Sequence, residues 1–344
     1  MDIVVNARFL QQQLTGVQRY AREVTARLRN RLRFVEPGSY AQGVAGHLWE
    51  QAILPRPLGE GALLWSPTNS GPLGVTNQVV TIHDLSVLDH PEWFSPRFGA
   101  WYRFLLPRLA RRVKHVLTDS EYSRTRIVTL LAVPEERVSV VPLGVSPGFR
   151  PAQEVGDQRP GPLPGLPQDY LVVVGSLEPR KNLARVFDAW ERVRSSHPDV
   201  TLLVLGGAAR VFRGRGFAEA PKGVLLAGYV ADHDLPRLYG AAVGFVYASL
   251  YEGFGLPVLE AMACGTPVVC SNTTSLPEVA GNAALLVDPT DVDDIAHGMG
   301  RLLSDRELRD RLRAQGLARA RQFNWDVTAE RTWDILVHQA EVNP

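Results

Sequence analysis

The sequence predicts an α/β protein of two domains, each with a parallel sheet covered by helices. The chain has 344 residues, more than one hydrophobic core usually organises. Short runs of Val, Ile and Leu alternate with segments of helical spacing along its length. Residues 150–168 contain five prolines and three glycines without periodicity, which is typical of a linker. We therefore expect domains at 1–150 and 169–323, a linker at 151–168 and a last helix at 324–344.

The strands of the first domain are predicted from apolar runs of four or five residues. These runs are Asp2–Asn6, Leu63–Ser66, Val79–His83, His115–Thr118 and Val138–Pro142. Residues 17–28 have apolar side chains at Val17, Tyr20, Val24 and Leu28, which is helical spacing.

The second domain is expected to contain a longer series of strands. They are Tyr170–Val174, Thr201–Leu205, Val224–Ala227, Gly244–Ala248, Pro267–Cys270 and Ala284–Val287. The chain from Asp291 onwards is predicted to be helical and to end in an amphipathic helix at Trp325–Gln339. Parallel α/β sheets bind ligands outside the carboxyl ends of their strands. We therefore expect the functional loops to follow strands and to face one another across a cleft between the domains.

Composition narrows the class of protein. Hydrophobic residues make up 45% of the chain and charged residues 21%, as in an ordinary globular protein. No run of 18 apolar residues is present, and the N-terminus has no basic segment before its first strand. We expect a cytoplasmic protein. Cys264 and Cys270 are the only cysteines and have no histidine at a zinc-like spacing, so neither a disulfide framework nor a zinc site is expected.

Charge is unevenly distributed between the halves. Residues 1–150 carry 18 Lys and Arg against 12 Asp and Glu, and the remainder carries 19 against 24. A basic first half suggests contact with something anionic, although sampling variation explains the difference about as well. The excess is too small for a dedicated nucleic-acid binder.

The segment 249–272, SLYEGFGLPVLEAMACGTPVVCSN, is the most informative loop. It follows a predicted strand and enters a two-turn helix expected to begin at Pro257 and end before Gly265. Glycines in the loop let a ligand approach the backbone, and a helix N-terminus offers N–H donors. Glu252 and Glu260 could accept hydrogen bonds from vicinal hydroxyls of a sugar. The alternative for Glu260 is a favourable charge near a helix N-terminus.

The segment 175–182, GSLEPRKN, follows the first strand of the second domain. Arg180 and Lys181 together can neutralise a diphosphate. The chain has only three lysines against 34 arginines. Because lysine is rare here, Lys181 is less readily explained as a surface residue that only adds solubility. The alternative is a solvent-exposed basic pair with Glu178 as its counter-charge.

Two loops of the first domain are further candidates. In QQLTGV, residues 12–17, Thr15 is expected to cap a helix and Gly16 to let a phosphate or acceptor meet the backbone. In TIHD, residues 81–84, His83 ends a buried strand at the edge where ligands bind. A structural histidine is an equally good explanation there.

Metal binding is not expected. Asp232–Asp234 and Asp291–Asp294 resemble acidic metal-binding patterns, but each precedes a helical segment, so helix capping explains them better. The sequence also lacks the glycine-rich motifs of P-loop nucleotidases and of dinucleotide-binding enzymes.

With these motifs together, the chain resembles the retaining glycosyltransferases of family 4, the glycosyl transferases group 1, which have the GT-B fold of two Rossmann-like domains. The resemblance rests on Glu252 and Glu260 in YEGFGLPVLEAMACGTPVV, on GSLEPRKN, on SEYSRTRI at 120–127 and on VVPLGV at 140–145. It extends over nearly the whole chain and includes a resemblance to bacterial mannosyltransferases.

The resemblance implies a role for each matching position. Glu260 would hold the ribose of the nucleotide, and Glu252 with the backbone of Gly253, Phe254, Gly255 and Leu256 would contact the donor hexose. Arg180 and Lys181 would hold the diphosphate and stabilise its charge as it leaves. Gly16 would lie by the phosphates or the acceptor, and His83 beside the sugar ring. Such enzymes need no metal or other cofactor, and their last helix crosses back to the first domain.

The expected function is transfer of a hexose, mannose from GDP-mannose in the first instance, to a glycan or lipid-linked acceptor of polysaccharide biosynthesis. Retention would follow from front-side attack assisted by the leaving phosphate. A UDP-sugar donor is the nearest alternative. A GT-B phosphorylase or a nucleotide-sugar epimerase is the next alternative among enzymes. A phosphorylase would be expected to have a lysine placed for pyridoxal phosphate and a much longer chain, and neither is evident. A GT-B sugar-binding protein without turnover is the alternative outside enzymes.

Residues 93–118 contain no Asp or Glu, and their basic residues gather between 97 and 114. On a helix, Phe98, Tyr102, Leu105, Leu106, Leu109 and Val113 form an apolar face. A second face combines aromatic with basic side chains, namely Arg97, Trp101, Phe104, Arg108, Arg111 and Arg112. This face suits an anionic membrane or a polyprenyl-diphosphate acceptor, with Lys114 adding to the charge. We therefore expect peripheral contact with the inner membrane face, the alternative being arginine stems that cover an ordinary surface.

Overall fold

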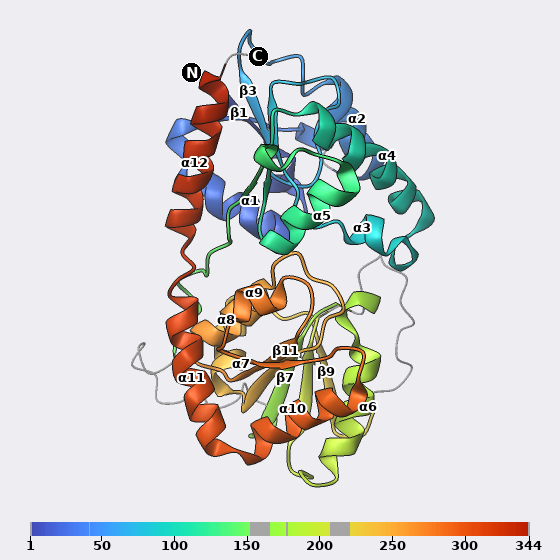
Figure 1. Ribbon diagram of the computed structural model, residues 1–344, viewed down its shortest axis with the longest axis vertical. Coiled ribbons are helices and arrows are strands. Elements are labelled where there is room, and N and C mark those ends of the chain that lie inside the picture. The colour runs from blue at the N-terminus through green and yellow to red at the C-terminus, as the bar shows by residue number, and fades with distance from the viewer. Residues whose placement is uncertain (1, 41, 152–165, 177, 207–220, 343–344) are drawn as a thin grey trace. The chain divides into compact units, whose positions relative to one another are not determined.

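The computed structural model describes residues 2–40, 42–151, 166–176, 178–206 and 221–342 (Figure 1). The chain divides into two compact units, each described here by itself. The N-terminal unit contains residues 1–89, 96–144 and 323–344, and the second contains 90–95 and 145–322. The first boundary thus falls at Gly144, earlier than residue 150, because residues 145–150 pack with the second unit. Most of the expected linker lies outside the described residues.

The N-terminal sheet is entirely parallel, as the sequence predicts. Its strands are β1 (Ile3–Asn6), β2 (Arg33–Val35), β3 (Leu63–Ser66), β4 (Gln78–Thr81), β5 (His115–Thr118) and β6 (Val138–Val140). Their order is β2-β1-β3-β4-β5-β6. The strand β2 was not predicted, because its three residues are half-buried or exposed at the sheet edge and carry no apolar run.

Helices α1 (Gly16–Arg27), α2 (Gly43–Ala52), α3 (Ser86–Asp89), α4 (Pro96–Arg112), α5 (Glu121–Leu131) and α12 (Trp325–Glu341) complete this unit. The last helix of the chain packs along α1, as Figure 1 shows. Apolar packing holds this contact, since Tyr20 and Trp325 are both fully buried with ring centroids 6.4 Å apart. Arg27 adds an ion pair with Asp326 at 2.6 Å.

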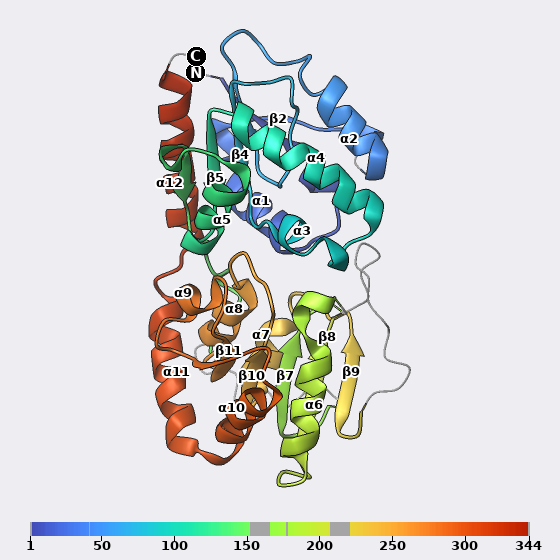
Figure 2. The same cartoon turned by 45° about the vertical axis from the view of Figure 1, so that its right-hand side comes forward.

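The sheet of the second unit is also parallel. Its strands are β7 (Tyr170–Val174), β8 (Thr201–Leu205), β9 (Val224–Gly228), β10 (Gly244–Tyr247), β11 (Val268–Ser271) and β12 (Leu285–Val287). Their order is β12-β11-β10-β7-β8-β9. Figure 2 shows the strands from β11 to β9 of this sheet. The chain runs outward from β7 to β9 and then returns to place β10 on the other side of β7. This reversal between β7 and β10 is the point where doubly wound sheets open a crevice for a ligand.

Helices α6 (Leu183–Arg194), α7 (Leu235–Ala241), α8 (Leu256–Ala263), α9 (Leu276–Ala280), α10 (Val292–Ser304) and α11 (Arg306–Ala320) surround this sheet. The fully buried Trp190 of α6 and Met299 of α10 lie in one apolar core with Leu171 of β7. This core fixes the start of α6. It thereby also fixes the loop that joins the carboxyl end of β7 to α6.

The two acidic patterns, Asp232–Asp234 and Asp291–Asp294, differ in whether they cap the helix that follows. Asp291 caps α10, because its carboxylate accepts hydrogen bonds from the backbone N–H groups of Asp293 and Asp294. The expectation that Asp234 caps α7 is wrong, since its own backbone is helical and its side chain makes no capping bond. The described residues contain no cluster of three or more side chains that could hold a metal ion. Among their helices, none has the length and apolarity needed to cross a bilayer.

Candidate active site

The candidate site of the second unit is built from two loops at the reversal of strand order. Residues 175–182 follow β7, and residues 248–255 follow β10. These strands are parallel neighbours, with Leu171 paired to Gly244, so the two loops leave the sheet at the same edge. Residues about 70 positions apart in the sequence are thereby brought into contact.

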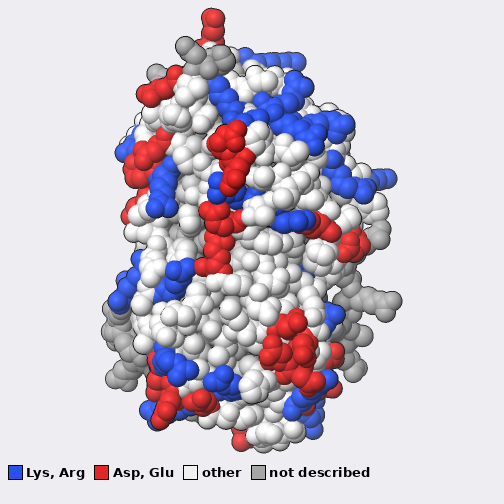
Figure 3. All heavy atoms as spheres, in the orientation of Figure 1, with Lys and Arg blue, Asp and Glu red and all other residues white. Residues whose placement is uncertain are grey.

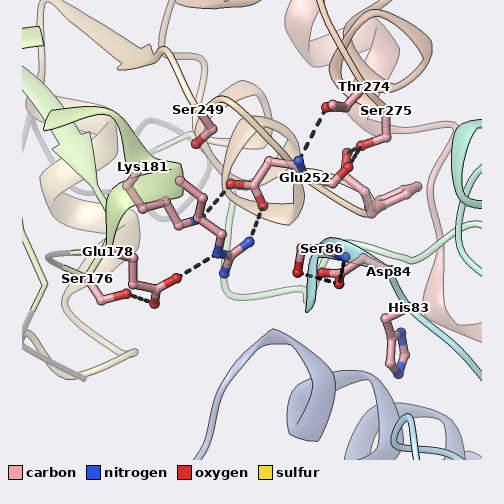
Figure 4. A network of polar contacts seen from close by, with 12 residues as sticks. His83, Asp84, Ser86, Ser176, Glu178, Lys181, Ser249, Glu252, Thr274 and Ser275 are labelled. Atoms are coloured by element: carbon pink, nitrogen blue, oxygen red, sulfur yellow. Dashed lines mark hydrogen bonds and ion pairs between the residues drawn. The ribbon is translucent and has the colours of Figure 1, made fainter. Parts of the chain in front are cut away.

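Arg180 and Lys181 both reach Glu252 across this gap. The Lys181 Nζ donates to Glu252 Oε1 at 2.6 Å, and Arg180 Nη1 donates to Oε2 at 3.2 Å. Figure 4 shows Lys181 and Glu252 pointing toward each other. Arg180 Nε also donates to Glu178 Oε2 at 2.6 Å. The side chains of Arg180 and Lys181 are 19% and 10% exposed, so the alternative of a solvent-exposed pair is wrong.

The charges of this cluster govern its titration. Burial by itself would raise the pKa of Glu252, but the neighbouring Lys181 and Arg180 outweigh burial and lower this pKa to about 2. Burial and the positive charge of Arg180 lower the pKa of Lys181, against the opposing effect of Glu252 and Glu178. The charges of the two carboxylates balance those of the two cations. An incoming anion can therefore replace a carboxylate as the partner of cations that are already held close together.

Backbone requirements explain the composition of the loop after β7. Asn182 has a left-handed conformation with φ of 59°, and its amide donates to the carbonyls of Ala248 and Pro289 at 3.0 and 2.6 Å. A Cβ at Gly175 would lie 2.9 Å from Cγ of Lys181. A larger residue at Gly175 would therefore displace Lys181. Asn182 fixes the end of the 3₁₀ turn that contains Lys181, η7 (Pro179–Lys181).

The loop after β10 is held by hydroxyl groups of the segment before α9. Ser275 Oγ lies 2.9 Å from the carbonyl oxygen of Glu252 and 2.8 Å from that of Phe254. The backbone N–H of Glu252 donates to Thr274 Oγ1 at 3.3 Å. These contacts, visible in Figure 4, restrain the backbone on both sides of the carboxylate.

The helix α8 begins at Leu256, one residue before the predicted start at Pro257. Gly255 is its N-cap with φ of 110°, and a Cβ there would lie 2.5 Å from Leu276 Cδ2, so only glycine fits. Gly253, Phe254 and Leu256 are buried around this corner. Glu260 lies in the second half of the helix and is 5% exposed, so it is not a surface charge that only complements the helix dipole.

In the N-terminal unit, His83 follows β4 and is buried. Its Nδ1 lies 2.6 Å from Asp119 Oδ2, and its Nε2 lies 3.0 Å from the carbonyl oxygen of Pro67. Burial by itself would lower the pKa of His83, but the carboxylate of Asp119 outweighs burial and raises it. Since both ring nitrogens have partners, contact with a sugar would require the ring to leave the Pro67 carbonyl.

The motif SEYSRTRI positions the end of β4. Ser120 caps α5 by accepting a hydrogen bond from the Ser123 N–H at 3.1 Å. The hydroxyl of Ser123 donates to the His83 carbonyl at 3.0 Å. This part of the resemblance therefore has a structural explanation, which is to hold the loop after β4.

Gly16 is the exposed first residue of α1. Thr15 is the N-cap residue of α1, as expected, but its hydroxyl donates to the Gln18 side chain and makes no capping hydrogen bond with the backbone. A Cβ at Gly16 would meet no atom within 4 Å. Packing therefore does not require glycine at this position.

Sequence reasoning missed Tyr247 and the role of Asn182. Tyr247 is the last residue of β10 and contacts both Lys181 and Glu252 through its hydroxyl. Its place at the carboxyl end of a buried strand, five residues before Glu252, was the available signal. The asparagine stood in the quoted motif, but no pattern in the sequence predicted its left-handed backbone.

Comparison with known families agrees with this arrangement. The family model described as glycosyl transferases group 1 matches residues 157–319, and the model described as glycosyltransferase family 4 matches residues 55–149. The first match spans both loops of the candidate site.

Two curated relatives are similar at the sequence level. O-antigen chain mannosyltransferase B of Escherichia coli is 37% identical over 278 residues, which cover 74% of this chain and 68% of the relative. The MMP alpha-(1->4)-mannosyltransferase of Mycolicibacterium hassiacum is 35% identical over 255 residues, 70% of this chain and 58% of the relative. The chain thus spans about two thirds of the first relative and somewhat less of the second.

A solved structure extends the likeness of fold to nearly the whole chain. Anabaena Alr3699/HepE in complex with UDP-glucose superposes with a TM-score of 0.72 at 19% identity, covering 98% of this chain and 100% of the other. WaaG, a glycosyltransferase involved in lipopolysaccharide biosynthesis, has a TM-score of 0.71 at 15% identity and covers 98% and 99%. The chain therefore belongs to the glycosyl transferases group 1 family, and it is a glycosyltransferase with the GT-B fold.

Proposed function

We propose that this enzyme transfers mannose from GDP-mannose to a glycan acceptor with retention of anomeric configuration. The relatives named as mannosyltransferases support the sugar. The observation that carries the proposal is the convergence of Arg180 and Lys181 on Glu252 at the reversal of strand order. Two cations at one buried point fit a diphosphate, and an adjacent carboxylate fits the hydroxyls of its sugar.

Each residue of the site has a task in this reaction. Arg180 and Lys181 bind the diphosphate and stabilise the charge that develops as the nucleotide leaves. Glu252 and the backbone of residues 253–256 orient the hexose, and Glu260 binds the ribose. Gly16 and His83 contribute from the N-terminal unit, by the phosphates or acceptor and by the sugar ring. Because the side chains supply the positive charge, the reaction needs no metal.

A panel of donors tests this function. The purified protein is incubated with radiolabelled GDP-mannose, UDP-glucose and UDP-N-acetylglucosamine, and both transfer and slow hydrolysis are measured. Release of labelled mannose from GDP-mannose alone supports the proposal. If the protein uses only a UDP-sugar, the proposed donor is wrong, but the enzyme is still a glycosyltransferase. The UDP-glucose complex of the Anabaena neighbour makes this the competing outcome. The anomeric configuration of the product, read by NMR, tests retention.

We also propose that α4 and α2 bring the enzyme to an anionic membrane that carries a lipid-linked acceptor. Arg97, Arg103, Arg108 and Arg112 are exposed on α4, and basic side chains gather over this helix in Figure 3. On α2, Val44 and Leu48 are 76% and 63% exposed. His47 of α2 contacts Trp101 of α4 with ring centroids 5.1 Å apart, so the two helices adjoin.

Two basic residues of this segment also hydrogen-bond to backbone carbonyls within the protein. Arg111 Nε donates to the carbonyl of Leu131 at 2.8 Å, which closes the end of α5. Lys114 Nζ donates to the carbonyls of Gln339 and Val342 at the end of α12. These hydrogen bonds hold the two side chains at helix ends without neutralising their charge, so their contribution to the membrane contact stays part of the proposal.

A further inference from the structure

Tyr247, Lys181 and Glu252 form a closed triangle of hydrogen bonds in the second unit. Lys181 Nζ donates to the Tyr247 hydroxyl and to Glu252 Oε1, both at 2.6 Å. The Tyr247 hydroxyl donates in turn to Glu252 Oε1 at 2.9 Å. Tyr247 is 2% exposed, and its ring lies 4.9 Å from Nζ of Lys181. One carboxylate oxygen therefore has a charged partner and a neutral partner at the same time.

The direction of these bonds follows from the donors present. An ammonium group has three protons and cannot accept, so Tyr247 accepts from Lys181 and its own proton points to Glu252. Burial and the charge of Glu252 raise the pKa of Tyr247, which keeps the hydroxyl protonated. The tyrosine can thus donate to Glu252 whether or not Lys181 stays in place.

Binding of a diphosphate would disturb this triangle. If Lys181 turns its protons to the phosphate oxygens, Glu252 Oε1 loses its charged partner. The Glu252 side chain is only 8% exposed, so water cannot readily replace that partner. An unpaired buried carboxylate oxygen is costly, and this cost would be subtracted from the affinity for the donor.

We propose that Tyr247 is a positioning residue that keeps Glu252 Oε1 hydrogen-bonded when Lys181 turns to the diphosphate. The inference rests on the proposed function, because it requires Lys181 to bind the diphosphate. It assigns Tyr247 no contact with the substrate. The hydroxyl lowers the cost of releasing Lys181 and holds the carboxylate in the orientation that the sugar meets.

Removal of the hydroxyl has two opposing effects on donor binding. Lys181 loses one partner in the free enzyme, which favours its release. Glu252 loses its remaining neutral partner in the bound enzyme, which disfavours release. The second effect is larger, because the group left unpaired is a charge, whereas the partner given up by Lys181 is a neutral hydroxyl.

The test compares Tyr247→Phe with wild type by calorimetric binding of nucleotides. The probes are GDP and UDP, of which the tighter-binding is used, together with its monophosphate. We expect the diphosphate to bind roughly tenfold more weakly, the scale of one hydrogen bond to a charged group, while the monophosphate binds as before. Unchanged affinity for the diphosphate, or equal loss for both nucleotides, would overturn the proposal.

Tyr170→Phe is the matched control. Tyr170 is also fully buried, and its hydroxyl donates to the Leu238 carbonyl at 2.7 Å. Tyr170 is the first residue of β7, so it lies at the end of this strand opposite to the candidate site. Both variants should fold, as checked by thermal melting, and Tyr170→Phe should leave the selectivity between the two nucleotides unchanged. A similar loss of selectivity in the control would show that sheet stability causes the effect and would contradict the proposal.

A double-mutant cycle with Lys181→Met separates this inference from the function on which it rests. If Tyr247 acts through Lys181, the double variant should bind the diphosphate about as weakly as Lys181→Met alone. Additive losses would refute action through the lysine while leaving the diphosphate site intact. If Lys181→Met itself binds the diphosphate normally, the proposed role of Lys181 fails, and the inference fails with it.

Discussion

Glu252 is the residue around which the candidate site is organised. Its carboxylate contacts Lys181, Arg180 and Tyr247, and its backbone is held by Thr274 and Ser275. Such a buried cluster is stable only while its charges stay paired. Substitutions in it should therefore lower stability, so each test of binding or transfer also needs a readout of stability.

Arg180→Ala or Lys181→Ala should reduce kcat/KM for the donor by roughly 10²-fold or more, the scale of losing one group that stabilises a developing charge. Steady-state kinetics with the donor found in the panel measures this effect. Circular dichroism and thermal melting control for unfolding, since each change leaves Glu252 with one cation fewer. Normal turnover in both variants would remove the diphosphate assignment.

The two glutamates should behave differently. Glu260→Ala should weaken binding of the free nucleoside diphosphate, because its proposed partner is the ribose. Glu252→Ala should not weaken nucleotide binding, because it removes the carboxylate that competes for Lys181, and it should damage transfer, because the proposed partner of Glu252 is the sugar. Calorimetry with the nucleotide alone and transfer assays with the full donor measure the two effects. Identical behaviour of both variants toward the nucleotide would rule out this division of roles.

At the level of elements, α2 and α4 are unusual in what they leave exposed. Within residues 37–55 the only charged side chain is that of Glu50, which is fully buried and bonded to Arg8 at 2.7 Å. The face of α2 toward solvent is therefore apolar, and the neighbouring α4 is basic. Apolar side chains beside arginines are typical of surfaces that bind anionic membranes.

This surface predicts binding to anionic vesicles but not to neutral ones, with binding weakened by high salt. Trp101→Ala combined with Arg108→Glu should reduce binding in a flotation assay, because each basic residue near the membrane contributes about 1 kcal/mol. Leu48→Gln tests the contribution of α2. Arg306→Glu, an equal change of charge on an exposed side chain of α11, is the control and should leave binding unchanged. Wild type that stays unbound to anionic vesicles at low salt would disprove the membrane contact.

For the whole molecule, two parallel sheets carry the GT-B fold, and the second has the strand order that opens a crevice beside β7. Cations at this crevice come from side chains of the chain itself. The proposed chemistry therefore predicts that the complete enzyme is independent of divalent metal. No substitution of a single residue tests this property.

Transfer should persist in excess EDTA, because Arg180 and Lys181 provide the positive charge that a metal would otherwise supply. The measurement is the initial rate of transfer before and after chelation, followed by addition of Mg²⁺ or Mn²⁺. Loss of activity on chelation and recovery with metal would contradict the proposal and return attention to Asp232 and Asp234.

The sequence by itself determined the described strands other than β2, and the loops that follow them. Apolar runs located β3, β5, β7 and β8 to the residue, because strands buried on both faces are rich in apolar residues. Pro257 located the start of α8 to within one residue. Family motifs pointed to Arg180, Lys181, Glu252 and Glu260, and their proposed roles stay predictions.

Tertiary structure alone decided which of these groups touch. The contacts of Lys181 with Tyr247 and Glu252 join residues 66 and 71 positions apart, and they exist because β10 returns to lie beside β7. The same holds for Arg111 and Lys114, which donate hydrogen bonds to backbone carbonyls at the ends of distant helices. Local periodicity records which face of an element is buried. It carries no information about which element covers that face, and long-range packing supplies the partner of each polar group.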